Sequence, residues 1–123
     1  MNSAFWDRLE ELVRESRIVI DRPAGTAHPR YPAAIYPLDY GYLAGTTAAD
    51  RDGIDVWVGS LPGTQVVGVI CTVDATQRDA EIKVLVGCTP QEAERALAWH
   101  NRGGQGGLLV WRYAGGVSTE DGG

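Results

Sequence analysis

The chain has 123 residues, of which 44% are apolar and 22% are charged, proportions typical of one soluble globular domain. Acidic residues outnumber basic ones 16 to 11, and the net charge of −5 disfavours a general nucleic-acid binder, which needs a basic face. No apolar run is long enough to cross a bilayer, which disfavours a membrane protein. The two cysteines occur singly in apolar surroundings, as expected for buried free thiols in a reducing cytoplasm.

Two helices and a series of short strands are predicted in chain order. Ser3 is the expected N-cap of a helix whose apolar residues recur at helical spacing. The second helix is predicted to start at Thr89 and to run to about Asn101. There, TPQE supplies an N-cap, a proline at the first helical position and a glutamate at the third. Strands are expected where β-branched residues recur, at 17–21, 36–44, 54–60, 65–74, 80–87 and 108–113.

The order of these elements predicts the fold class. Several short strands with a helix at each end indicate an α+β fold, in the form of a small β-barrel with flanking helices. Residues 22–35 form a long irregular segment, and loops of that length are usually functional or disordered. We expect a single domain over residues 1–113 and a flexible tail over residues 114–123.

Five aspartates gather in two short segments. Asp50, Asp52 and Asp55 lie in the run DRDGID, and Asp74 and Asp79 lie in the run VDATQRD. Two unit charges about 4 Å apart repel by about 4 kcal/mol at an effective dielectric constant of about 20, so such a cluster needs cations. Carboxylate oxygens select Mg²⁺ or a related ion, which then holds phosphate oxygens and activates water. The pattern predicts metal-assisted phosphate chemistry.

Other interpretations of these motifs stay open. DRDGID also fits a solvated acidic turn between two strands, or less well a calcium loop, since it lacks the late bidentate glutamate of an EF-hand. The single RGGQGG run at 102–107 is interpreted as a flexible loop, because one copy in an acidic domain is weak evidence for RNA binding. His28 is expected to be exposed in its loop. His100 is explained by a favourable interaction with the dipole at a helix end.

Together these motifs resemble the soluble, Mg²⁺-dependent inorganic pyrophosphatases. DRDGID is similar to the D-x-D-x-x-D signature of that family, and YPLDYGY to its YP-x-x-YGY run. VDATQRDAEIK resembles its D-x₄-D element followed by a lysine. DRPAG and PRY resemble a family segment with an acidic residue and, nine positions on, a basic one. The resemblance covers residues 18 to 86, with a weaker likeness at HNR, residues 100–102.

The resemblance implies a five-stranded OB-like β-barrel whose cavity binds Mg²⁺, or Mn²⁺ in its place, and pyrophosphate. It implies hydrolysis to two phosphates, with Asp52 as the general base for a metal-activated water. It implies metal ligands at Asp50, Asp55, Asp74 and Asp79. It implies substrate contacts at Arg30, Tyr40, Asn101 and Arg102, and Lys83 is expected to join them as a further substrate ligand that neutralises phosphate charge. Since bacterial members of the family assemble into closed oligomers, a cytoplasmic homo-oligomer is also expected.

The chain departs from the family pattern at the phosphate-binding positions. Residues 31–36 are about one hairpin shorter, and an arginine that grips phosphate is lost with that hairpin. Arg30 stands where a lysine is usual, and Asn101 where a tyrosine is usual. Glu81 occupies the place of a family lysine, and Lys83 follows two positions later. Two alternatives therefore stay open: hydrolysis of another small phosphorylated metabolite, or a non-catalytic metal-binding OB-like module.

Overall fold

The computed structural model describes residues 3–48, 52–113 and 117–118. The elements are α1 (Ser3–Glu15), β1 (Ile18–Arg22), β2 (Asp39–Leu43), β3 (Ile54–Val58), β4 (Val66–Asp74), β5 (Asp79–Val86), α2 (Pro90–His100), β6 (Gln105–Trp111) and β7 (Val117–Ser118). Both predicted helices are present, and every predicted strand segment overlaps an observed strand, although β6 begins three residues earlier than predicted. Of the tail predicted over 114–123, the two residues of β7 are described and pair with β6.

The strands form one open sheet in the order β1-β2-β3-β5-β4-β6-β7. β3 and β5 pair in parallel, and the other neighbours pair antiparallel. The predicted α+β fold with flanking helices is confirmed, but the predicted closed barrel of five strands is not observed. Closure would need pairing between β1 and β7, and within the described ranges β7 has two residues that pair with β6.

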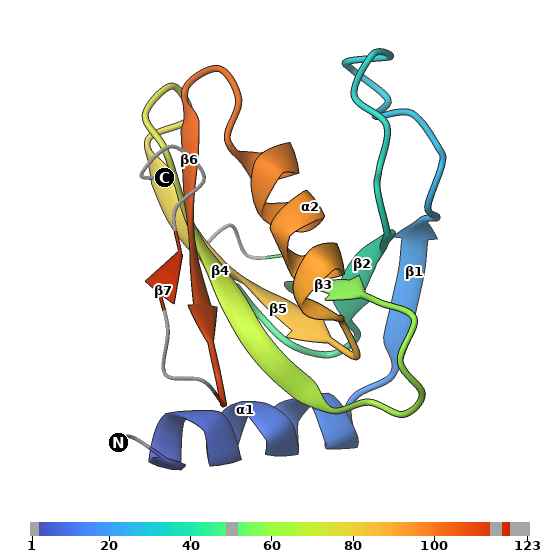
Figure 1. Ribbon diagram of the computed structural model, residues 1–123, viewed down its shortest axis with the longest axis vertical. Helices are drawn as coiled ribbons and strands as arrows, with labels where there is room; N and C mark the ends of the chain where they lie inside the picture. The colour runs from blue at the N-terminus through green and yellow to red at the C-terminus, as the bar shows by residue number, and fades with distance from the viewer. Residues whose placement is uncertain (1–2, 49–51, 114–116, 119–123) are drawn as a thin grey trace.

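Alternating side chains divide the apolar core between the two faces of the sheet. On β5, Val84 and Val86 pack with Leu9 and Val13 of α1, whereas Leu85 belongs to the cluster beneath α2. Successive strand residues point to opposite faces, so α1 and α2 cover different faces, as their positions in Figure 1 suggest. Neither described helix has the length and apolar character that a membrane span requires.

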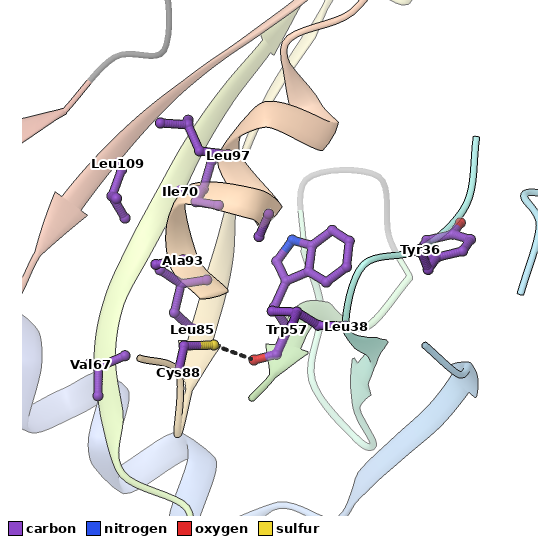
Figure 2. Packing of buried hydrophobic residues seen from close by; sticks show 11 residues of the cluster. Tyr36, Leu38, Trp57, Val67, Ile70, Leu85, Cys88, Ala93, Leu97 and Leu109 are labelled. Atoms are coloured by element: carbon purple, nitrogen blue, oxygen red, sulfur yellow. Dashed lines mark hydrogen bonds between the residues drawn. The ribbon is translucent and has the colours of Figure 1, made fainter. Parts of the chain in front are cut away.

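Trp57 is the centre of the core beneath α2. It is fully buried, and Figure 2 shows its indole between α2 and the ring of Tyr36, whose centroid lies 6.0 Å from that of Trp57. The thiol of Cys88 donates to the Trp57 carbonyl over 3.9 Å. Burial, with the nearby charge of Glu92, raises the pKa of Cys88 to about 12, so this thiol stays protonated. Both cysteines are free, as predicted.

The loop between β1 and β2 is held by its own backbone. Gly25 N donates to Tyr36 O, and His28 N donates to Ala34 O, each over 2.9 Å. Residues 23–38 therefore form a long folded-back loop rather than a disordered connection. Figure 1 shows this loop rising from the sheet on one side of α2, with the β4–β5 hairpin on the other side.

Helix α2 begins with the predicted capping box. Thr89 Oγ1 accepts from Glu92 N over 3.2 Å, and Glu92 Oε1 accepts from Thr89 N over 2.8 Å. Glu92 also accepts from Ser60 N over 3.1 Å, which ties the helix to the segment after β3. Burial would raise the pKa of Glu92, but these hydrogen bonds outweigh burial and lower the pKa below its ordinary value.

Replacing Thr89 with alanine should therefore remove one half of the capping box. We expect Thr89→Ala to lower the free energy of unfolding by about 1 kcal/mol, the usual value of an N-cap side chain. Urea unfolding at neutral pH measures this change. Thr64→Ala, in an exposed turn, is the matched control and should leave stability unchanged. Equal stability of both variants would contradict the structural role of the cap.

Candidate functional site

Four of the charged residues singled out from the sequence lie on the sheet face that α2 partly covers: Asp55, Asp74, Asp79 and Lys83. Asp74 on β4 stands directly opposite Asp79 on β5. Lys83 follows Asp79 on β5 at an even spacing, so the two share a face with Leu85 of the core beneath α2. On β3, Asp55 shares the face of the buried indole two residues later. The alternation predicted for β3 and β5 is confirmed.

A buried ion-pair network joins three of these strands. Lys83 Nζ lies 2.7 Å from Asp55 Oδ2 and 2.6 Å from Glu81 Oε1. Tyr40 OH, from β2, donates to the same Asp55 oxygen over 2.8 Å. Lys83 is 7% exposed and is the one lysine of the chain. One ammonium group therefore balances two carboxylates beneath the surface.

The environment keeps both hydrogen-bond donors of this network protonated. Burial would lower the pKa of Lys83, but the charge of Asp55 and contacts with Glu81 outweigh burial, so the pKa lies above its ordinary value. Burial, reinforced by the charge of Asp55, raises the pKa of Tyr40 well above its ordinary value. At neutral pH the Asp55 carboxylate therefore accepts from an ammonium and a phenol together.

A chain of hydrogen bonds connects the core to Asp74. Trp57 Nε1 donates to His100 Nε2 over 3.0 Å, and indole can only donate, so Nε2 is unprotonated. The proton then lies on His100 Nδ1, which donates to Gln105 Oε1 over 2.7 Å. Gln105 Nε2 donates in turn to Asp74 Oδ2 over 3.5 Å. Asp74 also caps the hairpin turn through Gln77 N, 2.9 Å from its Oδ1.

His100 is a neutral core residue rather than a helix-end cation. It is 2% exposed, and burial lowers its pKa to about 4. The interpretation of this histidine through a favourable dipole interaction was wrong, because an uncharged ring gains little from the dipole. The signal that was missed is the spacing of His100 and Gln105, which the turn into β6 brings together.

A cleft of about 990 Å³ opens beside Asp74. Arg30 and Tyr31 line it from the β1–β2 loop, and Arg102, Gln105 and the end of α2 line its other side. The guanidinium carbon of Arg102 lies 4.3 Å from the ring centroid of Trp99, a cation–π contact that orients the side chain. The structure thus brings two predicted phosphate ligands, Arg30 and Arg102, to one cleft with the predicted metal ligand Asp74.

Other predicted site residues do not line this cleft. Asn101 Oδ1 accepts from Gly107 N over 2.8 Å, so this side chain supports the turn into β6. Asp79 is exposed at the hairpin, and Asp52 is exposed just before β3. Asp50 lies outside the described residues.

The protein has an α+β fold whose sheet carries an acidic face next to an arginine-lined cleft. These are the groups that phosphate binding needs. A family model, Inorganic Pyrophosphatase, matches residues 21–108. The chain belongs to the inorganic pyrophosphatase family.

Individual relatives agree with this family. Inorganic pyrophosphatases of Geobacillus stearothermophilus and Bacillus sp. (strain PS3) are each 35% identical over 60 residues, 42% of this chain and 36% of their own length. The match thus spans about a third of those relatives. In fold, the chain is similar to an inorganic pyrophosphatase from Neisseria gonorrhoeae (TM-score 0.59, 19% identity, 72% of this chain and 76% of that one). It is also similar to one from Helicobacter pylori (TM-score 0.54, 14% identity, 85% of this chain and 84% of that one).

The family is generally metal-dependent, and the donor chemistry of this chain fits a hard divalent cation. The predicted ligands are all carboxylates, the oxygen donors that Mg²⁺ prefers. Among residues 3–48, 52–113 and 117–118, however, no three His, Cys, Asp or Glu side chains are grouped to hold a metal. Asp55 is held by Lys83 instead.

The pKa of His100 gives a stability prediction. A histidine with an ordinary pKa of 6.5 when unfolded and about 4 when folded stabilises the fold fully above pH 6.5. This contribution is lost as the pH falls toward 4, and at about 1.36 kcal/mol per pH unit it reaches about 3 kcal/mol. In His28→Gln, His100 is the one histidine left, so NMR titration of its ring reports this pKa directly. A midpoint near 6.5 in the folded protein would contradict the buried, neutral ring.

Removing the ammonium of Lys83 should strongly destabilise the fold. Lys83→Met leaves Asp55 and Glu81 as uncompensated, partly buried charges, so we expect a loss of about 3 kcal/mol in the free energy of unfolding at pH 7. Urea unfolding measures it. Arg8→Met, which breaks the exposed Arg8–Glu11 pair, is the control and should cost little. Similar losses of unfolding free energy in the two variants would show that the buried network contributes no more to stability than the exposed ion pair.

Proposed function

We propose that the protein catalyses Mg²⁺-dependent hydrolysis of inorganic pyrophosphate to two phosphates. The observation that carries the proposal is the cleft lined jointly by Arg30, Arg102 and Asp74, in a chain of the pyrophosphatase family. Cationic guanidinium groups bind phosphate oxygens, and a carboxylate at the same cleft supports a bound cation. Free cysteines favour a reducing compartment, so we place this activity in the cytoplasm.

The arginines are the proposed substrate ligands. Arg30 comes from the β1–β2 loop and Arg102 from the turn after α2, so they approach a substrate from two separate segments. A guanidinium offers paired N–H donors that match two oxygens of one phosphate. The stacking of Arg102 on Trp99 restricts the guanidinium group before the substrate binds, and this reduces the conformational entropy lost on binding.

Asp50, Asp55, Asp74 and Asp79 are the proposed ligands of the cation. A bound Mg²⁺ supplies neutralisation of phosphate charge and acidification of water. Asp52 accepts the proton of the attacking water, since it is a carboxylate in the same acidic segment. Lys83 and Tyr40 hold the Asp55 carboxylate in a fixed orientation until the cation competes for it. Gln105 orients Asp74 from the core side.

Phosphate release from pyrophosphate, with and without Mg²⁺, tests the proposal. We expect release by the native chain to depend on Mg²⁺, and Asp52→Asn to lower kcat by at least about 100-fold, as for loss of a general base. Asp7→Asn, an exposed aspartate of α1, is the matched control and should keep the native rate. Native release without Mg²⁺, or equal rates for the two variants, would contradict the mechanism. Metal binding without any release would favour a non-catalytic module.

A further inference from the structure

The cleft has an aromatic wall that the hydrolysis of pyrophosphate does not use. We define the aromatic wall as His28, Tyr31 and Trp99, all of which line the cleft. The ring centroids of His28 and Tyr31 are 5.1 Å apart, and those of His28 and Trp99 are 6.2 Å apart. Tyr31 is 58% exposed, so much of its ring is open to a ligand in the cleft.

This wall does not fit a substrate made of phosphate alone. Pyrophosphate is small and polar on every side, so it has no apolar surface to place against a ring. The cleft has a volume of about 990 Å³, at the upper end of the roughly 300 to 1,000 Å³ that is typical of pockets for ligands much larger than pyrophosphate. Ring faces beside a nucleotide, in contrast, contribute through stacking, which every base offers.

The charge in the cleft is arranged for a ligand with an anionic end and a flat end. Burial, followed by the charges of Arg102, Arg22 and Arg30, lowers the pKa of His28, so its ring is neutral at pH 7. The His28 ring is therefore uncharged, whereas the guanidinium of Arg102 covers a face of Trp99. A base would stack on His28 and Tyr31, while the arginines mark where phosphates would lie. Trp99 stacks on Tyr36, with ring centroids 4.7 Å apart, and this contact braces the wall against the core.

The lining of the cleft also includes polar groups from two other segments. Thr76 and Gln77 belong to the β4–β5 turn, and Gly104 belongs to the segment before β6. Ala75 N donates to Gly104 O over 3.0 Å, so the two segments form one rim. A hydroxyl, an amide and backbone groups on this rim suit the hydrogen-bonding edge of a base or the hydroxyls of a ribose.

We propose that this cleft binds a nucleoside diphosphate, with its base on the aromatic wall and its phosphates at Arg30 and Arg102. The hydrolytic part of this inference rests on the proposed function, because it uses the same water and base. Water adds to the terminal phosphorus while the bond from that phosphorus to the bridging oxygen breaks. The bridging oxygen keeps the electron pair and leaves as part of a nucleoside monophosphate, and the water proton passes to Asp52.

Two ligands that resist hydrolysis isolate the contribution of the nucleoside. Methylenediphosphonate mimics pyrophosphate, and α,β-methylene adenosine diphosphate adds an adenosine to the same anionic group. Calorimetric titration in Mg²⁺ should show that the native chain binds the nucleotide analogue at least about tenfold more tightly, the effect of one stacked base. Equal affinities for the two analogues would overturn the proposal.

Variants of the wall make the test specific. Tyr31→Ala should abolish the preference for the nucleotide analogue without lowering the affinity for methylenediphosphonate. Tyr31→Phe, which keeps the ring, should preserve the preference. Tyr113→Ala is the matched control, since Tyr113 is equally exposed at 58% but lies outside the cleft lining. A preference that survives Tyr31→Ala, or that Tyr113→Ala also removes, would contradict the role of the wall. Thermal unfolding of each variant confirms that it is folded.

Hydrolysis assays separate this inference from the proposed function. Mg²⁺-dependent release from pyrophosphate together with equal binding of both analogues would support the proposed function and overturn the nucleotide site. Tight, Tyr31-dependent binding of the nucleotide analogue with no release from pyrophosphate or adenosine diphosphate would support the nucleotide site. That second outcome would contradict the proposed hydrolysis.

Discussion

Negative charge gathered on one face of the sheet needs a cation beside it, and this requirement organises the centre of the molecule. Asp55 comes from β3 and Glu81 from β5, two strands that pair in parallel, and the ammonium of Lys83 lies within 2.7 Å of both carboxylates. Since the contacts are mostly shielded from water, the ion pairs are stronger than surface pairs, but their desolvation also costs more. The register of β3 against β5 is therefore tied to the charge balance.

Residues of the apolar core hold one of the carboxylates at the cleft in place. Trp57 is fully buried beneath α2 and starts the hydrogen-bond chain through His100 and Gln105 to Asp74. Each donor in that chain meets one acceptor, so the neutral tautomer of His100 is fixed by its neighbours. One chain of hydrogen bonds thus joins the buried indole to a carboxylate at the cleft.

Local patterns in the sequence predicted local structure well. The capping box at Thr89 and the alternation that places Asp55 and Lys83 on the α2 face depend on residues within a few positions of each other. The ion pair between Asp55 and Lys83 joins residues 28 positions apart, and strand pairing, which the pattern does not encode, creates it. The predicted barrel closure was wrong for the same reason, because closure depends on pairing between edge strands that lie far apart in the chain. The sequence likewise did not predict that Asn101 Oδ1 accepts from Gly107 N, because the turn into β6 brings these two groups together.

The proposed hydrolysis requires that the acidic sheet face and the arginine-lined cleft act together on phosphate. A crystal structure with Mg²⁺ and methylenediphosphonate tests this most directly. We expect phosphonate oxygens in contact with the guanidinium groups of Arg30 and Arg102, and Mg²⁺ on the carboxylates of Asp55 and Asp74. Phosphonate bound away from this cleft, or Asp55 still paired with Lys83 at saturating Mg²⁺, would contradict that requirement.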